Sequence, residues 1–208
     1  MRRVRTGSVA DMKTPREVRT IGPIRTIPNV ITVVRTLAAV FIAAYALTID
    51  DPKWWIVTGY AIYWIGDSLD GLAARVLDQE TRAGAVFDIL SDRISTALLA
   101  GGLIHLQPDL WPAITIFLLN FMVLDCMLSL SFLLWPIASP NYFASIDPLV
   151  FKLNWSHPAK ALNNVGIVVA ILVGSLPIAL VIVLAQISVK VWSARVVLER
   201  VREKDYAG

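Results

Sequence analysis

The chain has 208 residues, of which 56% are hydrophobic and only 17% are charged. A soluble domain of this length carries about 25% charged residues, so the composition excludes an ordinary water-soluble domain. The single cysteine, Cys126, excludes an intrachain disulfide, and helix packing must therefore hold the fold together. The net charge at pH 7 is only +3, and we expect no nucleic-acid partner.

Residues 1–26 form a basic segment before the first apolar stretch. Its Lys and Arg residues are Arg2, Arg3, Arg5, Lys13, Arg16, Arg19 and Arg25. The part from Thr14 to Thr26 predicts a short amphipathic helix that lies on anionic lipid headgroups. A disordered basic tail is the alternative, because Gly22 and Pro23 interrupt the segment.

Six apolar segments follow, each about as long as a helix needs to be to cross the hydrocarbon, roughly 20 residues. They cover residues 28–49, 54–77, 84–106, 110–136, 159–176 and 177–198. The sequence therefore predicts an all-α, polytopic membrane protein with six transmembrane helices. Residues 27–198 would form the transmembrane domain, and residues 199–208 a tail.

The Lys and Arg residues outside these spans gather on one side of the predicted membrane. Besides the N-terminal segment, that side holds Arg82, Lys152, Arg200, Arg202 and Lys204, whereas the other side has Lys53 alone. Basic loops remain in the cytosol. We therefore expect an integral protein of the cell membrane with both termini in the cytosol.

Four aspartates lie where the second predicted span ends and the third begins. Spacings of three and four place Asp67 and Asp70 on one helical face, and Asp88 and Asp92 on another. A short turn, about Leu77 to Ala83, makes the two helices antiparallel neighbours, so the two pairs face each other inside the cytosolic interface. Four carboxylates so close in a medium of low dielectric constant need cations.

The ligand types narrow the choice of cation. Oxygen ligands without nearby Cys or His suit Mg²⁺ or Mn²⁺ better than Zn²⁺. Two such ions can hold both ends of a displacement at phosphorus. Gly71, Ala74 and Gly84 would leave space for a flat base or a diphosphate to approach the backbone.

From Asp67 to Asp92 these residues read Asp-x2-Asp-Gly-x2-Ala-Arg-x8-Gly-x3-Asp-x3-Asp. This pattern resembles the signature of the CDP-alcohol phosphotransferase family, and the six-helix plan extends the resemblance over most of the chain. The resemblance implies an enzyme that moves a phosphatidyl group from CDP-diacylglycerol to a small polar alcohol in the membrane. It also suggests a homodimer.

The resemblance implies a role for each motif position. Asp67, Asp70, Asp88 and Asp92 would hold two metal ions, and Asp92 would also be the general base. The residues expected to bind the CDP-lipid are Gly71, Ala74, Arg75 and Gly84.

Four polar residues outside the core pattern are further candidates. Asn29 and Arg35 could contact the nucleotide or a lipid phosphate; alternatively, Asn29 caps a helix and Arg35 extends to the interface. Arg93, next to Asp92, points about a third of a turn away, and Lys160 lies at the start of the fifth span. Both could contact the acceptor.

Three polar residues lie deeper in the predicted membrane region. We expect Asp125 to make a polar contact between helices. Asn163 and Asn164 are equally consistent with helix–helix contacts and with substrate contacts.

The acceptor is less well defined by the sequence. The run from Thr81 to Asp88, with Ser91-Asp92-Arg93, looks like phosphatidylinositol and phosphatidylinositol-phosphate synthases, which favours an inositol-type acceptor. Glycerol 3-phosphate is the alternative. A carrier of divalent metal ions is the non-enzymatic alternative, although all four aspartates lie at one membrane face.

Overall fold

The computed structural model describes residues 21–162 and 174–206, and within them it contains helices and no strand. The long helices are α1 (Ile27–Ala46), α2 (Lys53–Val76), α3 (Arg82–Leu106) and α8 (Leu176–Tyr206). The shorter elements are η2 (Pro108–Leu110), α4 (Trp111–Leu119), η3 (Asn120–Asp125), α5 (Cys126–Leu130), η4 (Ser131–Leu134), η5 (Pro140–Ser145) and α6 (Pro148–Asn154). Residues 157–162 are also helical.

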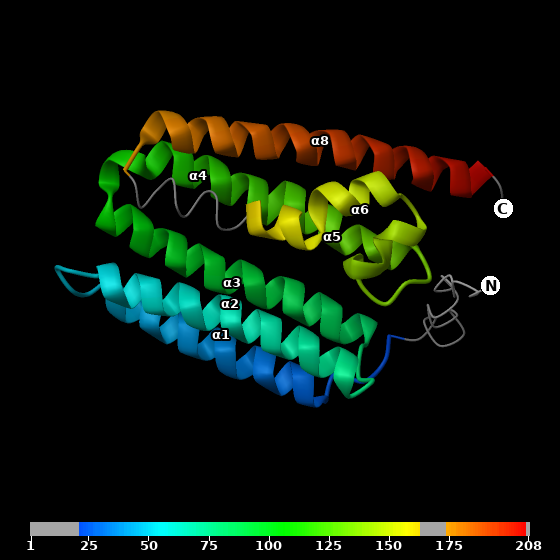
Figure 1. Ribbon diagram of the computed structural model, residues 1–208, viewed down its shortest axis with the longest axis horizontal. Helices are drawn as coiled ribbons and strands as arrows, with labels where there is room; N and C mark the ends of the chain where they lie inside the picture. The colour runs from blue at the N-terminus through cyan, green and yellow to red at the C-terminus, as the bar shows by residue number, and fades with distance from the viewer. Residues whose placement is uncertain (1–20, 163–173, 207–208) are drawn as a thin grey trace, which may run out of the picture.

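The helices form one elongated bundle. In Figure 1, α1, α2 and α3 lie together, α4 lies on the other side of α3, and α8 lies beyond α4. The turn between α2 and α3, the elements η5 and α6, and the end of α8 all lie at one end of the bundle. The predicted antiparallel arrangement of the second and third helices is confirmed.

Hydroxyl side chains define where α1 and α3 begin. The Thr26 hydroxyl accepts a hydrogen bond from Asn29 N–H, and the Thr81 hydroxyl accepts one from Gly84 N–H. Satisfying these otherwise unpaired N–H groups stabilises a helix start by about 1 kcal/mol.

The predicted N-terminal interfacial helix is not seen in the part of it that the structure describes. Residues 21–26 are not helical; instead Ala83 N–H donates to the Ile21 carbonyl at 2.9 Å. Gly22, at φ 76°, packs so tightly on Thr81 that a Cβ would lie 2.9 Å from the threonine Cβ. The chain thus bends over the start of α3, and residues 14–20 lie outside the described residues.

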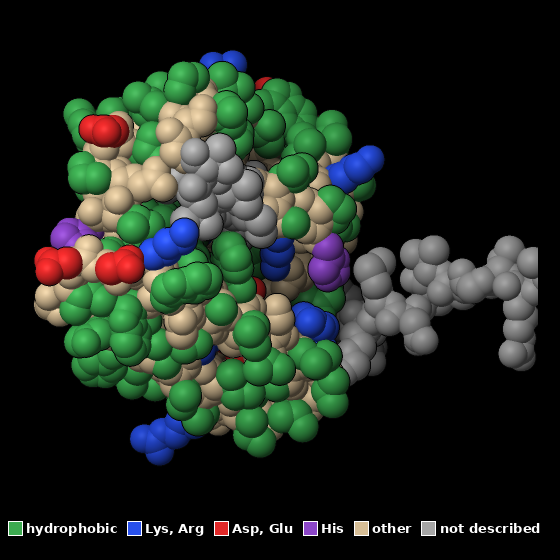
Figure 2. Space-filling model, turned by 60° about the vertical axis from the view of Figure 1, so that its left-hand side comes forward, with side chains coloured by type: hydrophobic (Ala, Val, Ile, Leu, Met, Phe, Trp, Pro, Cys, Tyr) green, Lys and Arg blue, Asp and Glu red, His purple; other side chains and the backbone are tan. Residues whose placement is uncertain are grey.

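Four helical stretches are long and apolar enough to cross a membrane, by length and composition, among the residues that the structure describes. They are Ile27–Ala46, Arg82–Leu106, Pro108–Leu134 and Leu176–Lys204. Figure 2 shows hydrophobic side chains over most of the visible surface, with few charges among them, and Phe41 and Trp54 are each 70% exposed. An apolar surface of this extent suits contact with lipid, and we conclude that the chain is an integral membrane protein.

The second and fifth predicted spans are not among these four stretches. Helix α2 is 24 residues long but carries Asp67, Asp70 and Arg75, and it is not one of the four apolar stretches. Most of the fifth span falls in residues 163–173, outside the described residues. The number of six spans therefore stays a prediction.

Two of the predicted spans have a different form from that expected. The fourth, 110–136, is interrupted by the π-helical segment η3, a type of turn often found at functional sites. The last continues to Tyr206 instead of ending at residue 198, because the charged residues after it are good helix formers. The expected tail is thus largely an extension of α8.

Candidate active site

The predicted site lies in a cavity at the end of the bundle where α2 ends and α3 begins. Asp67, Asp70, Asp88 and Asp92 all line it. The cavity continues inward between α3, η3 and α8, and at its mouth it reaches η5 and residue Lys160. The structure therefore brings both predicted carboxylate pairs into one space.

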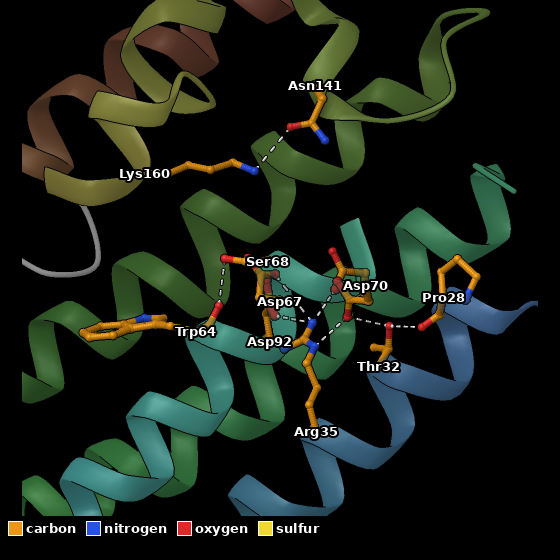
Figure 3. Close-up of polar contacts among 11 residues, drawn as sticks. Pro28, Thr32, Arg35, Trp64, Asp67, Ser68, Asp70, Asp92, Asn141 and Lys160 are labelled. Atoms are coloured by element: carbon orange, nitrogen blue, oxygen red, sulfur yellow. Dashed lines mark hydrogen bonds and ion pairs between the residues drawn. The ribbon is translucent and has the colours of Figure 1, made fainter. Parts of the chain in front are cut away.

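Arg35 of α1 lies at the centre of the four aspartates. Its Nε donates to Asp70 Oδ2 at 2.7 Å, and its Nη2 lies 3.1 Å from Asp92 Oδ1 and 3.6 Å from Asp67 Oδ1. Nη2 also donates to Asp88. Figure 3 shows the side chain extending from α1 toward the carboxylates. Arg35 is only 3% exposed, so it does not extend to the interface.

Arg35 packs behind the aspartates and is not among the residues that line the cavity. A glycine makes this position possible: a Cβ on Gly66 would lie 2.5 Å from Arg35 Cβ and 2.6 Å from its Cδ. The ring of Tyr63 lies 5.6 Å from the guanidinium carbon, and the Thr32 hydroxyl donates to Asp70 Oδ2 at 2.7 Å. The side chain is thus held on several sides by buried residues.

The carboxylates fit a hard divalent cation. Asp67, Asp70 and Asp88 each offer an oxygen, and these atoms lie within 4.8 Å of one another, close enough to share an ion at the usual metal–oxygen distances. Asp92 is outside that group of three but is joined to it through Arg35. One guanidinium balances only one of four carboxylate charges, so the cluster still favours cations.

The four motif residues expected to bind the CDP-lipid fall into two groups. Gly71, Ala74 and Arg75 line the cavity along one face of α2. Gly84 also lines it, but a Cβ there would come within 2.9 Å of both Asn29 Oδ1 and Thr81 Oγ1. The absence of a side chain at position 84 therefore lets α1 and α3 pack together, which sequence reasoning had not foreseen.

Asn29 does not cap α1, because Thr26 occupies the N-cap position. It is buried, lines the cavity, and its side-chain amide donates to the Ile24 carbonyl at 2.6 Å. This bond anchors the segment before α1 at the edge of the site.

Arg93 turns away from the motif aspartates, as its position next to Asp92 predicted. Its Nη2 lies 2.6 Å from Asp125 Oδ2, and its guanidinium carbon lies 3.8 Å from the centre of the Phe121 ring. Asp125 Oδ1 in turn lies 2.5 Å from Lys190 Nζ. The predicted polar contact of Asp125 between helices is confirmed, and it joins α3, η3 and α8.

Two contacts cross the mouth of the cavity. Lys160 Nζ donates to Asn141 Oδ1 at 3.3 Å (Figure 3), and the Tyr142 hydroxyl donates to Glu80. Partial burial and the neighbouring Glu80 carboxylate raise the pKa of Tyr142 to about 12, so this hydroxyl stays protonated at physiological pH. Asn163 and Asn164 lie outside the described residues.

Gly66 and Lys190 were not identified as site residues from the sequence, and Arg35 was identified only as a candidate contact for the nucleotide or a lipid phosphate. Gly66 gave no signal beyond its position before Asp67, and the central place of Arg35 depends on the packing of α1 against α2. Lys190 could have been found, because a lysine inside an apolar span is rare unless it has a function.

The chain belongs to the CDP-alcohol phosphatidyltransferase family, whose sequence profile matches residues 25–192. A CDP-diacylglycerol--glycerol-3-phosphate 3-phosphatidyltransferase of Cereibacter sphaeroides is 36% identical over 69 residues. That similarity covers 32% of this chain and 31% of the relative. No solved structure matches the chain. The family resemblance predicted from the motif is thus confirmed.

The contact between Gly66 and Arg35 can be tested by adding one methyl group. We expect Gly66→Ala to push Arg35 out of the carboxylate cluster and to lower the midpoint of thermal unfolding in detergent by several degrees. Gly101→Ala is the matched control, because a Cβ there meets nothing within 4 Å. Equal unfolding midpoints for the two variants would show that Arg35 is not held by this packing.

Proposed function

We propose that this protein transfers a phosphatidyl group from CDP-diacylglycerol to an alcohol and releases CMP. The observation that carries the proposal is the group of Asp67, Asp70 and Asp88 oxygens within 4.8 Å of one another, beside Asp92 in one cavity. The carboxylates are those of the family motif, and family membership supports the reaction type. A surface rich in exposed apolar side chains suits a lipid substrate.

Asp67, Asp70 and Asp88 would hold Mg²⁺ or Mn²⁺, and Asp92 would complete the site for a second ion. Bound metal would supply the positive charge that holds a diphosphate and stabilises the charge on departing CMP. Arg35 is already committed to the four carboxylates and lies behind them, so we assign it to their positioning instead of to nucleotide binding.

Asp92 is our candidate for the general base. The acceptor hydroxyl would give its proton to the Asp92 carboxylate while its oxygen bonds to the phosphorus that carries the diacylglycerol. The bond from that phosphorus to the oxygen bridging the two phosphates breaks, and CMP leaves with that oxygen and its negative charge. No covalent enzyme intermediate is needed.

The nucleotide would lie along α2, where Gly71 and Ala74 leave room and Arg75 can pair with phosphate. Gly84 and Asn29 would form the opposite wall, because both line the same cavity on α3 and α1. Arg75 is exposed at the end of α2, so it can reach a ligand from the membrane surface.

We consider two acceptors for this site. The sequence between Thr81 and Arg93 favours an inositol-type acceptor, and the curated relative, named for glycerol 3-phosphate, favours that molecule at least as strongly. Arg93 and Lys160 both line the cavity on the side away from α2 and are our candidates for acceptor contacts.

We also propose that the chain has six membrane spans, that it forms a homodimer and that its active site faces the cytosol. The distribution of Lys and Arg supports the orientation. A protease-cleavable tag after Gly208 should be cut in inverted vesicles and protected in sealed, right-side-out vesicles. Cleavage only in the right-side-out vesicles would reverse the orientation.

The metal requirement gives a direct test of the chemistry. Release of CMP from CDP-diacylglycerol by purified protein should stop in excess chelator and return when Mg²⁺ or Mn²⁺ is restored. The reason is that clustered carboxylates repel a diphosphate unless cations lie between them. Full turnover in metal-free buffer would contradict the proposed metal site.

A pair of substitutions separates the base from the ligands. Asp92→Asn keeps a coordinating oxygen but cannot accept a proton, so CMP release should fall at least about 10²-fold while CDP-lipid binding survives. Asp70→Asn should lose both CMP release and CDP-lipid binding, because Asp70 is one of the three carboxylates that would hold the metal ion. Binding is measured by calorimetry in Mg²⁺ buffer. Near-normal turnover of Asp92→Asn would exclude it as the base, and equal loss of binding in both variants would make it chiefly a metal ligand.

A further inference from the structure

Residues 138–155, which contain η5 and α6, lie at the mouth of the cavity and have a small apolar core of their own. Ser139 and Asn141 of this segment line the cavity. Phe143 and Val150 are fully buried in an apolar cluster that is separate from the main core of the bundle. Figure 1 shows α6 beside α8, toward the end of the bundle where α2 ends. We call residues 138–155 the η5–α6 segment.

One edge of the η5–α6 segment is firmly attached to α8. Val197 of α8, 5% exposed, belongs to the apolar cluster of the segment. The buried side-chain amide of Asn154 donates to Ser193 Oγ of α8 at 2.8 Å, and Arg200 Nη2 lies 3.2 Å from Asp147 Oδ2. Moving this edge away from α8 would expose apolar surface and break both polar contacts, so the edge stays in place.

The opposite edge, toward the turn between α2 and α3, is attached in a different way. Among the described residues, the apolar cluster takes members from α5 and α8 and none from α2 or α3. At this edge the Tyr142 hydroxyl donates to the Glu80 carboxylate, and Tyr142 is 37% exposed. A hydrogen bond at such a position exchanges readily for hydrogen bonds with water. The edge near Glu80 can therefore separate at much lower cost than the edge on α8.

The two water-soluble molecules of the proposed reaction would have to pass this mouth. The alcohol would enter and CMP would leave there, because that is where the cavity opens, and Glu80 lines the cavity beside it. The inner face of the η5–α6 segment also presents a polar atom: Ser139 Oγ is buried in the cavity wall without a hydrogen-bond partner among the described residues. Buried hydroxyl groups normally have partners, so this face suits a cavity that is filled and emptied in turn.

We propose that the η5–α6 segment is a hinged lid whose edge on α8 stays fixed, while its other edge opens and closes over the site, with the Tyr142–Glu80 hydrogen bond as the latch. This inference rests on the proposed function and adds a conformational step to it. The closed lid keeps water from the bound diphosphate, where water in place of the alcohol would give CMP and a lipid phosphate. The open lid releases CMP. The bond from Lys160 to Asn141 joins the lid to the chain directly after it and moves with the lid.

The first test measures opening without turnover, in the full-length protein in lipid nanodiscs. Ser139→Cys in a Cys126→Ser background puts a single thiol on the inner face of the lid. Its rate of labelling by a charged, water-soluble thiol reagent should rise about 10-fold when Tyr142→Phe is added, as expected for the loss of one charged hydrogen bond. Tyr45→Phe is the matched control, because it removes the same hydroxyl group from an exposed position at the far end of α1. Equal labelling rates with and without Tyr142→Phe would overturn the latch.

The second test locks the lid. Glu80→Cys and Tyr142→Cys, again with Cys126→Ser, are joined by a reducible thiol cross-linker as long as the two side chains that it replaces. Multiple-turnover CMP release from CDP-diacylglycerol, with Mg²⁺ and either glycerol 3-phosphate or inositol, should fall at least about 10-fold and recover on reduction, because product release needs an open lid. Asp147→Cys with Arg200→Cys is the control pair, because it joins the fixed edge to α8 and neither residue lines the cavity. Cross-linking this pair should leave its CMP release unchanged.

The outcomes separate this inference from the proposed function. No CMP release by the wild-type protein with either acceptor would sink the transfer reaction, while the labelling rates would still report whether the segment opens. Full turnover with the cross-link between positions 80 and 142 in place would leave the reaction intact and overturn the lid. Equal losses from both cross-links would overturn the hinge on α8. Should the double-cysteine variant not fold, the labelling rates decide the question alone.

Discussion

The ion pairs of Arg35 with four aspartates are the interaction on which the rest of this structure depends. They join α1, α2 and α3 toward the end of the bundle where α2 ends and α3 begins. A buried guanidinium with so many partners fixes the relative positions of the carboxylates without using the side of them that faces the cavity. The cluster can therefore be held in place and remain open to ligands at the same time.

Close packing of the helices makes this arrangement possible. Gly66 lets the Arg35 side chain pass α2, and Gly84 lets Asn29 of α1 approach α3. Both contacts therefore depend on the absence of a side chain. Buried alanines of α1, among them Ala39 and Ala43, line the rest of its packed face. Small residues permit close approach of helices in membranes, where packing must replace the hydrophobic driving force.

The motif spacing was enough to predict the carboxylate cluster, because residues three and four apart share a helical face whatever surrounds them. The place of Arg35 could not be predicted in this way, since it depends on how deeply α1 lies against α2, which no local pattern records. The π-helical segment was missed for a related reason: Asn120–Asp125 is as apolar as its neighbours, apart from its first and last residues. The N-terminal segment was mispredicted over residues 21–26 because contacts with the start of α3 outweigh its amphipathic pattern.

The ion pairs among Arg93, Asp125 and Lys190 also have a consequence for biogenesis. A charged side chain at the centre of an inserting helix costs about 2.5–3.5 kcal/mol on the translocon scale, and Arg93, Asp125 and Lys190 each lie on a different helical segment. The Arg93 charge is uncompensated until the segment that carries Asp125 has entered the bilayer, and Lys190 enters after both. Helix α8 is made after α3 and η3, so its lysine would meet an already assembled Arg93–Asp125 pair, and a chain that stops before α8 would leave that pair without Lys190. Completion of this charged group is thereby tied to the arrival of α8.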